Sequence, residues 1–161
     1  QKSVAAAIAA RIEAWEKAFM QRDLDGVLDL YSTEYQDPQG WRFQYVRRAY
    51  QWFFERYRGC RMRRQLRGWV FSPAENPDHV DVTLYCRFMG WALTDPTGRS
   101  ADVPAWFPRH DTGEVRLSFM LTQGQWRLIR TEPALPNMNE ILGFSTGPLD
   151  AFSQGPDVYK R

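Results

Sequence analysis

The chain has 161 residues, the length of one globular domain, and a domain of this size buries roughly 70% of its unfolded surface. Hydrophobic residues make up 43% of the sequence, but no window comes near the roughly 20 apolar residues that a membrane-spanning helix needs. The formal net charge is only +2, whereas nucleic-acid binding usually brings a stronger positive charge. We therefore expect a globular protein with no membrane span and no nucleic-acid partner.

Three helices are predicted in the first third of the chain. Ser3 can cap a helix that runs to about Met20, and Asp23 can cap a short helix that runs through Tyr31. A third helix is expected over residues 42–57. Their apolar residues recur every three or four positions and comprise Ile8, Ile12, Trp15, Phe19, Leu24, Val27, Leu28, Tyr31, Val46, Tyr50, Phe53 and Tyr57.

After Gly59 the apolar period changes from 3.6 to 2, which indicates strands. Along the second predicted strand, Val80, Val82 and Leu84 face one way and the intervening residues the other. The expected strands cover residues 61–71, 79–93, 114–122 and 125–131, with turns at 72–78 and 123–124 and a long connection over 94–113. The pattern predicts two antiparallel hairpins.

The two cysteines and two histidines form no metal or redox motif. Cys60 and Cys86 fall out of register in the first hairpin, which favours two free thiols over a disulfide. His79 and His110 each lie near acidic residues but lack a third ligand. No metal site and no cofactor are predicted.

Residues 21–40, QRDLDGVLDLYSTEYQDPQG, join a short amphipathic helix to an Asp-Pro turn. The segment resembles the opening of the nuclear-transport-factor-2-like superfamily, which includes ketosteroid isomerases and SnoaL-type cyclases. The resemblance is specific at Asp23-Leu24-Asp25-Gly26 and at Asp37-Pro38. It implies an α+β fold, cone-shaped and cystatin-like, in which three N-terminal helices pack on a strongly curved, mainly antiparallel sheet around a pocket. We assign this domain to residues 1–132 and a Pro/Gly-rich tail to residues 133–161, which could cover the pocket mouth or stay disordered.

Asp37 has two interpretations. In ketosteroid isomerases an Asp-Pro at this point supplies the general base that moves a proton between carbons, so the resemblance implies this role for Asp37. Alternatively, the carboxylate accepts backbone N–H bonds in a turn ahead of the third helix. The reaction also needs donors for an enolate oxygen. Here the chain departs from the family, with Trp15 in place of its oxyanion tyrosine and Ser118 near its protonated aspartate.

An aromatic-rich set could line the predicted pocket and bind a small apolar ligand, with tyrosine hydroxyls and Asp37 orienting it. Its members are Trp15, Phe19, Tyr31, Tyr35, Trp41, Tyr50, Phe54 and Tyr57. The alternative is a filled core in which the rings leave no cavity.

An arginine cluster follows the third predicted helix. Arg61, Arg63 and Arg67 share one face of an extended strand and could meet Arg87 and Asp81 across the hairpin. This face could bind an acidic partner or phosphates, since guanidinium groups pair with carboxylates and with phosphates. It could equally be a solvated, salt-bridged surface or the interface of a homodimer.

These features favour a non-catalytic domain that binds a small molecule or a peptide. Similar accessory domains stand beside bacterial cell-envelope enzymes, which favours a place outside the cytoplasm. One alternative is an isomerase, cyclase or dehydratase with Asp37 as base and Tyr31, Tyr35 or Tyr50 as polar assistant. Another is an assembly module that uses the arginine face. The chain begins at Gln1 without a charged segment followed by an apolar one, so we expect that any signal peptide has been removed. A periplasmic or secreted location is favoured, and a cytoplasmic one stays open.

Overall fold

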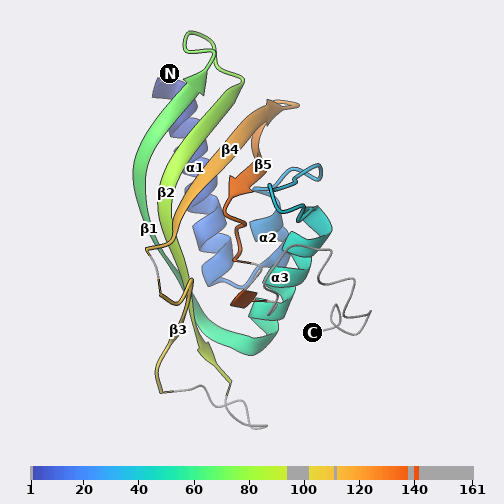
Figure 1. Ribbon diagram of the computed structural model, residues 1–161, viewed down its shortest axis with the longest axis vertical. Coiled ribbons are helices and arrows are strands. Elements are labelled where there is room, and N and C mark those ends of the chain that lie inside the picture. Colours follow the sequence, from blue (N-terminus) through green and yellow to red (C-terminus); the bar gives the residue numbers. More distant parts are fainter. Residues whose placement is uncertain (1, 94–101, 111, 138–139, 142–161) are drawn as a thin grey trace.

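The computed structural model describes residues 2–93, 102–110, 112–137 and 140–141. Three helices precede a five-stranded sheet, and the long strands bend around the helices (Figure 1). The elements are α1 (Lys2–Met20), α2 (Leu24–Leu28), α3 (Phe43–Arg56), β1 (Tyr57–Ser72), β2 (His79–Ala92), β3 (Ala105–Phe107), β4 (Glu114–Thr122) and β5 (Gln125–Glu132). The expected α+β cone is confirmed. None of the described helices is both long and apolar enough to cross a membrane.

The short helix α2 begins as predicted and ends early. The Asp23 side chain accepts a hydrogen bond from the Gly26 N–H at 3.1 Å, as an N-cap does. The helix stops at Leu28, three residues before the expected end at Tyr31. The Leu30 carbonyl accepts from the Leu128 N–H at 2.8 Å, and the Ser32 N–H donates to the Leu128 carbonyl at 2.7 Å. The backbone therefore leaves the helix because it pairs with β5.

The sheet runs in the order β1-β2-β4-β5, with β3 paired to β2, and all of these pairings are antiparallel. The predicted turns at 72–78 and 123–124 are confirmed, and β2 shows the expected alternation of buried and less buried residues. β1 starts at Tyr57 rather than at residue 61, because Tyr57 and Arg58 already pair with Ala92 and Trp91. We call the side of the sheet that faces the helices the inner face and the other side the outer face.

The expected connection over residues 94–113 contains a strand that the sequence analysis missed. β3 pairs with β2 through only three residue pairs, too few to produce a readable period. Its Phe107 is buried and packs edge-on against Phe53 and Tyr57, with ring centroids 5.5 and 5.6 Å away. Residues 94–101 and 111 of this connection lie outside the described part.

The core lies between the helices and the inner face of the sheet, and aromatic rings fill its centre. Phe19 stacks on Phe88 with ring centroids 4.6 Å apart, and Trp15 meets Phe88 edge-on at 5.9 Å. The described start of the predicted tail, residues 133–137 and 140–141, also belongs to this core, since Ala134, Leu135 and Ile141 are all buried. We call this segment the C-terminal strap. The rest of the tail lies outside the described residues.

Candidate functional site

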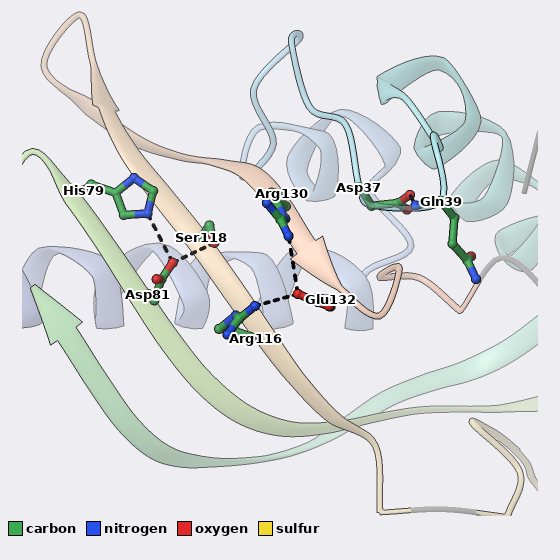
Figure 2. Close-up of polar contacts among 8 residues, drawn as sticks. All are labelled: Asp37, Gln39, His79, Asp81, Arg116, Ser118, Arg130 and Glu132. Carbon is green, nitrogen blue, oxygen red and sulfur yellow. Dashed lines mark hydrogen bonds and ion pairs between the residues drawn. The ribbon is translucent and has the colours of Figure 1, made fainter. Parts of the chain in front are cut away.

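Asp37 sits in a closed turn just ahead of α3 (Figure 2). Its Oδ1 accepts hydrogen bonds from the N–H groups of Gln39 and Trp41 at 2.9 and 3.0 Å. Its own N–H donates to the Trp41 carbonyl at 3.0 Å, and its carbonyl accepts from the Gly40 N–H at 3.0 Å. The carboxylate thus makes the backbone bonds of a turn, as one of the two sequence interpretations expects.

The Asp37 carboxyl is also shielded from solvent. The residue is 4% exposed, and its Oδ2 is buried without a hydrogen-bond partner in the described part of the chain. Burial raises the pKa of Asp37, while the backbone N–H groups and the nearby Tyr35 hydroxyl oppose that shift. The open hollow of about 490 Å³ beside this turn is lined by Tyr35, Gln36 and Arg42, among others, but not by Asp37.

None of the eight predicted pocket aromatics is more than 7% exposed. Trp15, Tyr31 and Tyr50 come together at the centre of the core. Trp41 packs edge-on against Tyr45, with ring centroids 5.1 Å apart. The remaining ring contacts include Tyr57 on Phe53 at 4.6 Å, Tyr31 on Tyr35 at 5.4 Å and Phe19 on Phe54 at 5.6 Å. The rings thus pack on one another, and ligand binding by them stays a prediction.

A chain of hydrogen bonds with a single direction runs through this interior. The Trp15 Nε1–H donates to the Tyr50 hydroxyl at 2.9 Å, and the two hydroxyls of Tyr50 and Tyr31 are 2.7 Å apart. The Tyr31 hydroxyl donates to the Leu135 carbonyl at 2.8 Å, so the proton between the two tyrosines must come from Tyr50. Burial raises the pKa of Tyr31 and of Tyr50, so both phenols stay neutral.

Leu135 is the residue that closes this interior, and sequence reasoning missed it. Its N–H donates to Thr131 Oγ1 at 3.0 Å, and Thr131 Oγ1 lies 2.6 Å from the Tyr35 hydroxyl. Both main-chain polar groups of Leu135 are therefore satisfied by buried side chains. The signal in the sequence is slight: an Ala-Leu pair between Pro133 and Pro136.

The cavity that remains beside the strap is small. It measures about 40 Å³ and lies between Cys86, Phe88 and Phe107 on one side and strap residues such as Leu135 on the other. A volume of this size accommodates a water molecule but no drug-sized ligand. None of the eight predicted aromatics lines it.

The predicted arginine face lies on the outer side of β1 and β2. Arg63 stands directly opposite Arg87 in the strand register, and the Arg67 guanidinium lies over the Tyr85 ring, 5.0 Å from its centroid. Arg61 Nη1 donates to the neighbouring Cys60 carbonyl at 2.8 Å. A hollow of about 460 Å³, called the arginine hollow below, is lined by Arg63, Arg64, Gln65, Tyr85, Arg87 and Thr112. Arg61, Arg63 and Arg67 form no ion pair with any carboxylate in the described residues.

The expected contact between these arginines and Asp81 is wrong. Asp81 lies opposite Val70, well along β1 from Arg63. Its carboxylate accepts a hydrogen bond from the Ser118 hydroxyl at 2.6 Å and lies 3.2 Å from His79 Nε2 (Figure 2). The bulge between Leu66 and Gly68 changes the pairing at this point, which the sequence did not reveal.

No protein-family model matches this sequence, and no curated protein matches it significantly. Solved structures do match. A candidate scytalone dehydratase from Novosphingobium aromaticivorans DSM 12444 shares 10% identity at a TM-score of 0.62, over 80% of this chain and 81% of that one. A ketosteroid isomerase-like protein from Erwinia carotovora atroseptica SCRI1043 shares 20% identity at 0.53, over 78% and 91%.

An NTF-2 like protein of unknown function from Shewanella oneidensis MR-1 shares 12% identity at a TM-score of 0.53, over 79% of this chain and 95% of that one. At such identities the likeness establishes the fold alone. The fold of this chain is the NTF-2-like cone that the opening segment predicted.

Proposed function

We propose that this protein is a non-catalytic binding domain that holds a peptide or protein partner on the outer face of its sheet. The observation that carries the proposal is the contrast between the two hollows. The cavity beside the strap measures about 40 Å³, whereas the arginine hollow on the outer face measures about 460 Å³. Of these two, only the arginine hollow has room for the side chains of a partner. The hollows of about 490 Å³ beside Tyr35 and about 530 Å³ beside Tyr31 are as large, but their linings carry both signs of charge, whereas every charged residue of the arginine hollow is an arginine.

The interior groups that could serve proton transfer in the described part of the chain are inaccessible or already engaged. A general base must come within hydrogen-bond reach of the substrate proton, yet Asp37 is 4% exposed and binds backbone N–H groups through Oδ1. The Tyr31 hydroxyl already donates to Leu135. Ser118, which the resemblance places near an acid position of the family, donates to Asp81 instead.

The same cone carries proteins named for different activities. The similar structures include one named as ketosteroid isomerase-like, one as a candidate dehydratase and one of unknown function. Fold alone therefore supports neither an enzyme nor a binding protein, and the decision falls to the site. A small apolar ligand would have to displace Leu135, and a homodimer would have to use the same outer face as the partner.

Catalysis is tested first, with a β,γ-unsaturated steroid ketone whose isomerisation produces a conjugated absorbance. We expect no turnover above buffer from the wild type or from Asp37→Asn. The matched control is Asp25→Asn, which removes an exposed carboxylate from α2. Turnover that Asp37→Asn abolishes and Asp25→Asn retains would contradict the proposal.

Binding is tested by titrating isotopically labelled protein with poly-L-glutamate and following backbone amide shifts. We expect the shifts to concentrate on the outer face of β1 and β2, around Arg63 and Arg87. Shifts that concentrate instead around Tyr31 and Tyr50 would place the binding site in the interior and overturn the proposal.

A further inference from the structure

One edge of the sheet carries no partner strand from the described residues. β1 is the first strand in the order β1-β2-β4-β5, and in the described residues it pairs with β2 alone. Figure 1 shows it running along the margin of the molecule with no strand beyond it. A strand of 16 residues in this position presents a row of backbone N–H and C=O groups to which another chain can pair.

The charge of this edge strand is all of one sign. β1 contains Arg58, Arg61, Arg63, Arg64 and Arg67 and no acidic residue. Among the residues that the structure describes, Arg64 alone of these arginines reaches a carboxylate, since its Nη2 lies 3.2 Å from Glu16 Oε1 on the inner side. The outer arginines keep guanidinium groups that match carboxylates in geometry and charge.

Parts of the arginine hollow are held in place before any partner arrives. Arg87 Nε donates to the Pro108 carbonyl at 3.1 Å, and its guanidinium lies 4.8 Å from the centroid of the Trp106 ring. Arg67 rests on the Tyr85 ring. Side chains that are already ordered lose less conformational entropy on binding, so the hollow is organised for recognition.

We propose that an extended acidic segment of a partner protein pairs with the free edge of β1, and that its carboxylates bind Arg61, Arg63 and Arg67. This inference rests on the proposed function and names the partner's chemistry. Successive residues of a strand point to opposite faces, so acidic residues at every second position would all lie on the outer face. Main-chain hydrogen bonds would supply affinity, and the arginines would select the sequence.

Two other occupants fit less well. A second copy of this chain pairing β1 with β1 would set arginine against arginine, and like charges opposite each other destabilise a sheet. A nucleic-acid backbone would meet the carboxylates of Asp81, Glu114 and Glu132, which lie on the same outer face of β2, β4 and β5. The arginines could also serve only to prevent the sheet edges of two molecules from pairing, and the test below separates that role from binding.

The first probe is a fluorescein-labelled peptide of about ten residues that alternates Glu and Thr, added to the full chain and followed by anisotropy. We expect Arg63→Glu/Arg67→Glu to weaken binding by about tenfold or more. The matched control is Lys17→Glu/Arg47→Glu, which makes the same change in net charge at exposed helix positions. An equal loss of peptide affinity in both double variants would overturn the inference. So would the absence of binding of this peptide to the wild type at low salt.

The second probe separates strand pairing from simple attraction between charges. Two peptides of the same sequence are N-methylated at alternate residues. In one, the methylated amides are those that would face β1, and in the other they are those that would face away from it. We expect one peptide to lose binding and the other to keep it, with slowed hydrogen exchange of β1 amides in the complex. If both bind like the parent peptide, strand pairing is refuted while acidic-partner binding on the outer face stands.

Discussion

The hydroxyl of Tyr31 donates a hydrogen bond to the main-chain carbonyl of Leu135, which lies 104 residues further along the chain. This contact joins the segment after α2 to the C-terminal strap at the centre of the aromatic core. Leu135 supplies, from within the chain, the acceptor that the buried Tyr31 hydroxyl needs. The interior is therefore completed by the chain itself.

Tyr31→Phe tests this relationship. The change removes the donor to Leu135, leaves that carbonyl buried without a partner and takes away the acceptor of the Tyr50 proton. We expect a loss of about 1–3 kcal/mol in the free energy of unfolding, the usual cost of a buried polar group without a partner. Urea denaturation measures it. Tyr85→Phe, on the outer face, is the control and should change stability by about 0.5 kcal/mol or less.

Asp37→Asn tests the electrostatics of the turn. Burial raises the pKa of Asp37 above its ordinary value, so the folded state keeps the proton to a higher pH than the unfolded state. The stability linked to this group is complete below the unfolded pKa and is lost as the pH rises through the folded pKa. Asparagine still offers Oδ1 to the N–H groups of Gln39 and Trp41 but carries no charge.

The stabilities of the wild type and of Asp37→Asn are measured by urea denaturation at several pH values between about pH 3 and pH 7. We expect Asp37→Asn to gain stability relative to the wild type as the pH rises. Asp37→Ala, which removes both backbone bonds, should be destabilised at every pH. A relative gain of the wild type on raising the pH would show that the N–H groups outweigh burial.

Gly113→Ala tests a close backbone approach. Gly113 has a φ of +76°, and a Cβ there would collide with the Cys86 carbonyl oxygen. Gly124 has a similar φ of +79° but open space around it. Both substitutions carry the left-handed penalty of about 1–2 kcal/mol, and only Gly113→Ala adds a collision with the backbone. We expect Gly113→Ala to lower the free energy of unfolding by at least about 2 kcal/mol more than Gly124→Ala does, as measured by thermal or urea unfolding.

The two thiols should be unreactive in the folded protein. Cys60 and Cys86 are buried and free, and burial raises the pKa of Cys60 to about 11 and that of Cys86 further. In a thiol titration at pH 8 we expect negligible reaction before unfolding and full reaction in denaturant. Thr122→Cys, exposed at a hairpin, should react at once. Rapid reaction of the native wild type would show that the interior opens readily.

Much of the fold could be predicted because most elements are long enough for their periods to be read. The stripes of α1 and α3 and the alternation along β2 each extend over a dozen residues or more. β3 has only three residues, and α2 ends where the backbone pairs with β5. Both features are set by partners distant in sequence, and a single sequence carries no trace of such pairing.

The candidate site shows the same limit. Strand alternation alone placed Arg61, Arg63 and Arg67 on one face and brought Arg87 opposite this group, as the register confirms for Arg63. It misplaced Asp81, because a bulge shifts the register near Leu66. The Asp-Pro pair located the Asp37 turn. Its burial depends on packing around Trp41 and Tyr35, which local sequence does not determine.

The one-way hydrogen-bond chain from Trp15 through Tyr50 and Tyr31 to Leu135 has a practical consequence. Every proton in it is already donated to an acceptor inside the core, so none can exchange with water until the C-terminal strap is displaced. The exchange rates of the phenolic protons of Tyr31 and Tyr50 and of the indole proton of Trp15 therefore report the rate at which the interior opens. Their exchange lifetimes will report how often the interior admits water, with no label attached.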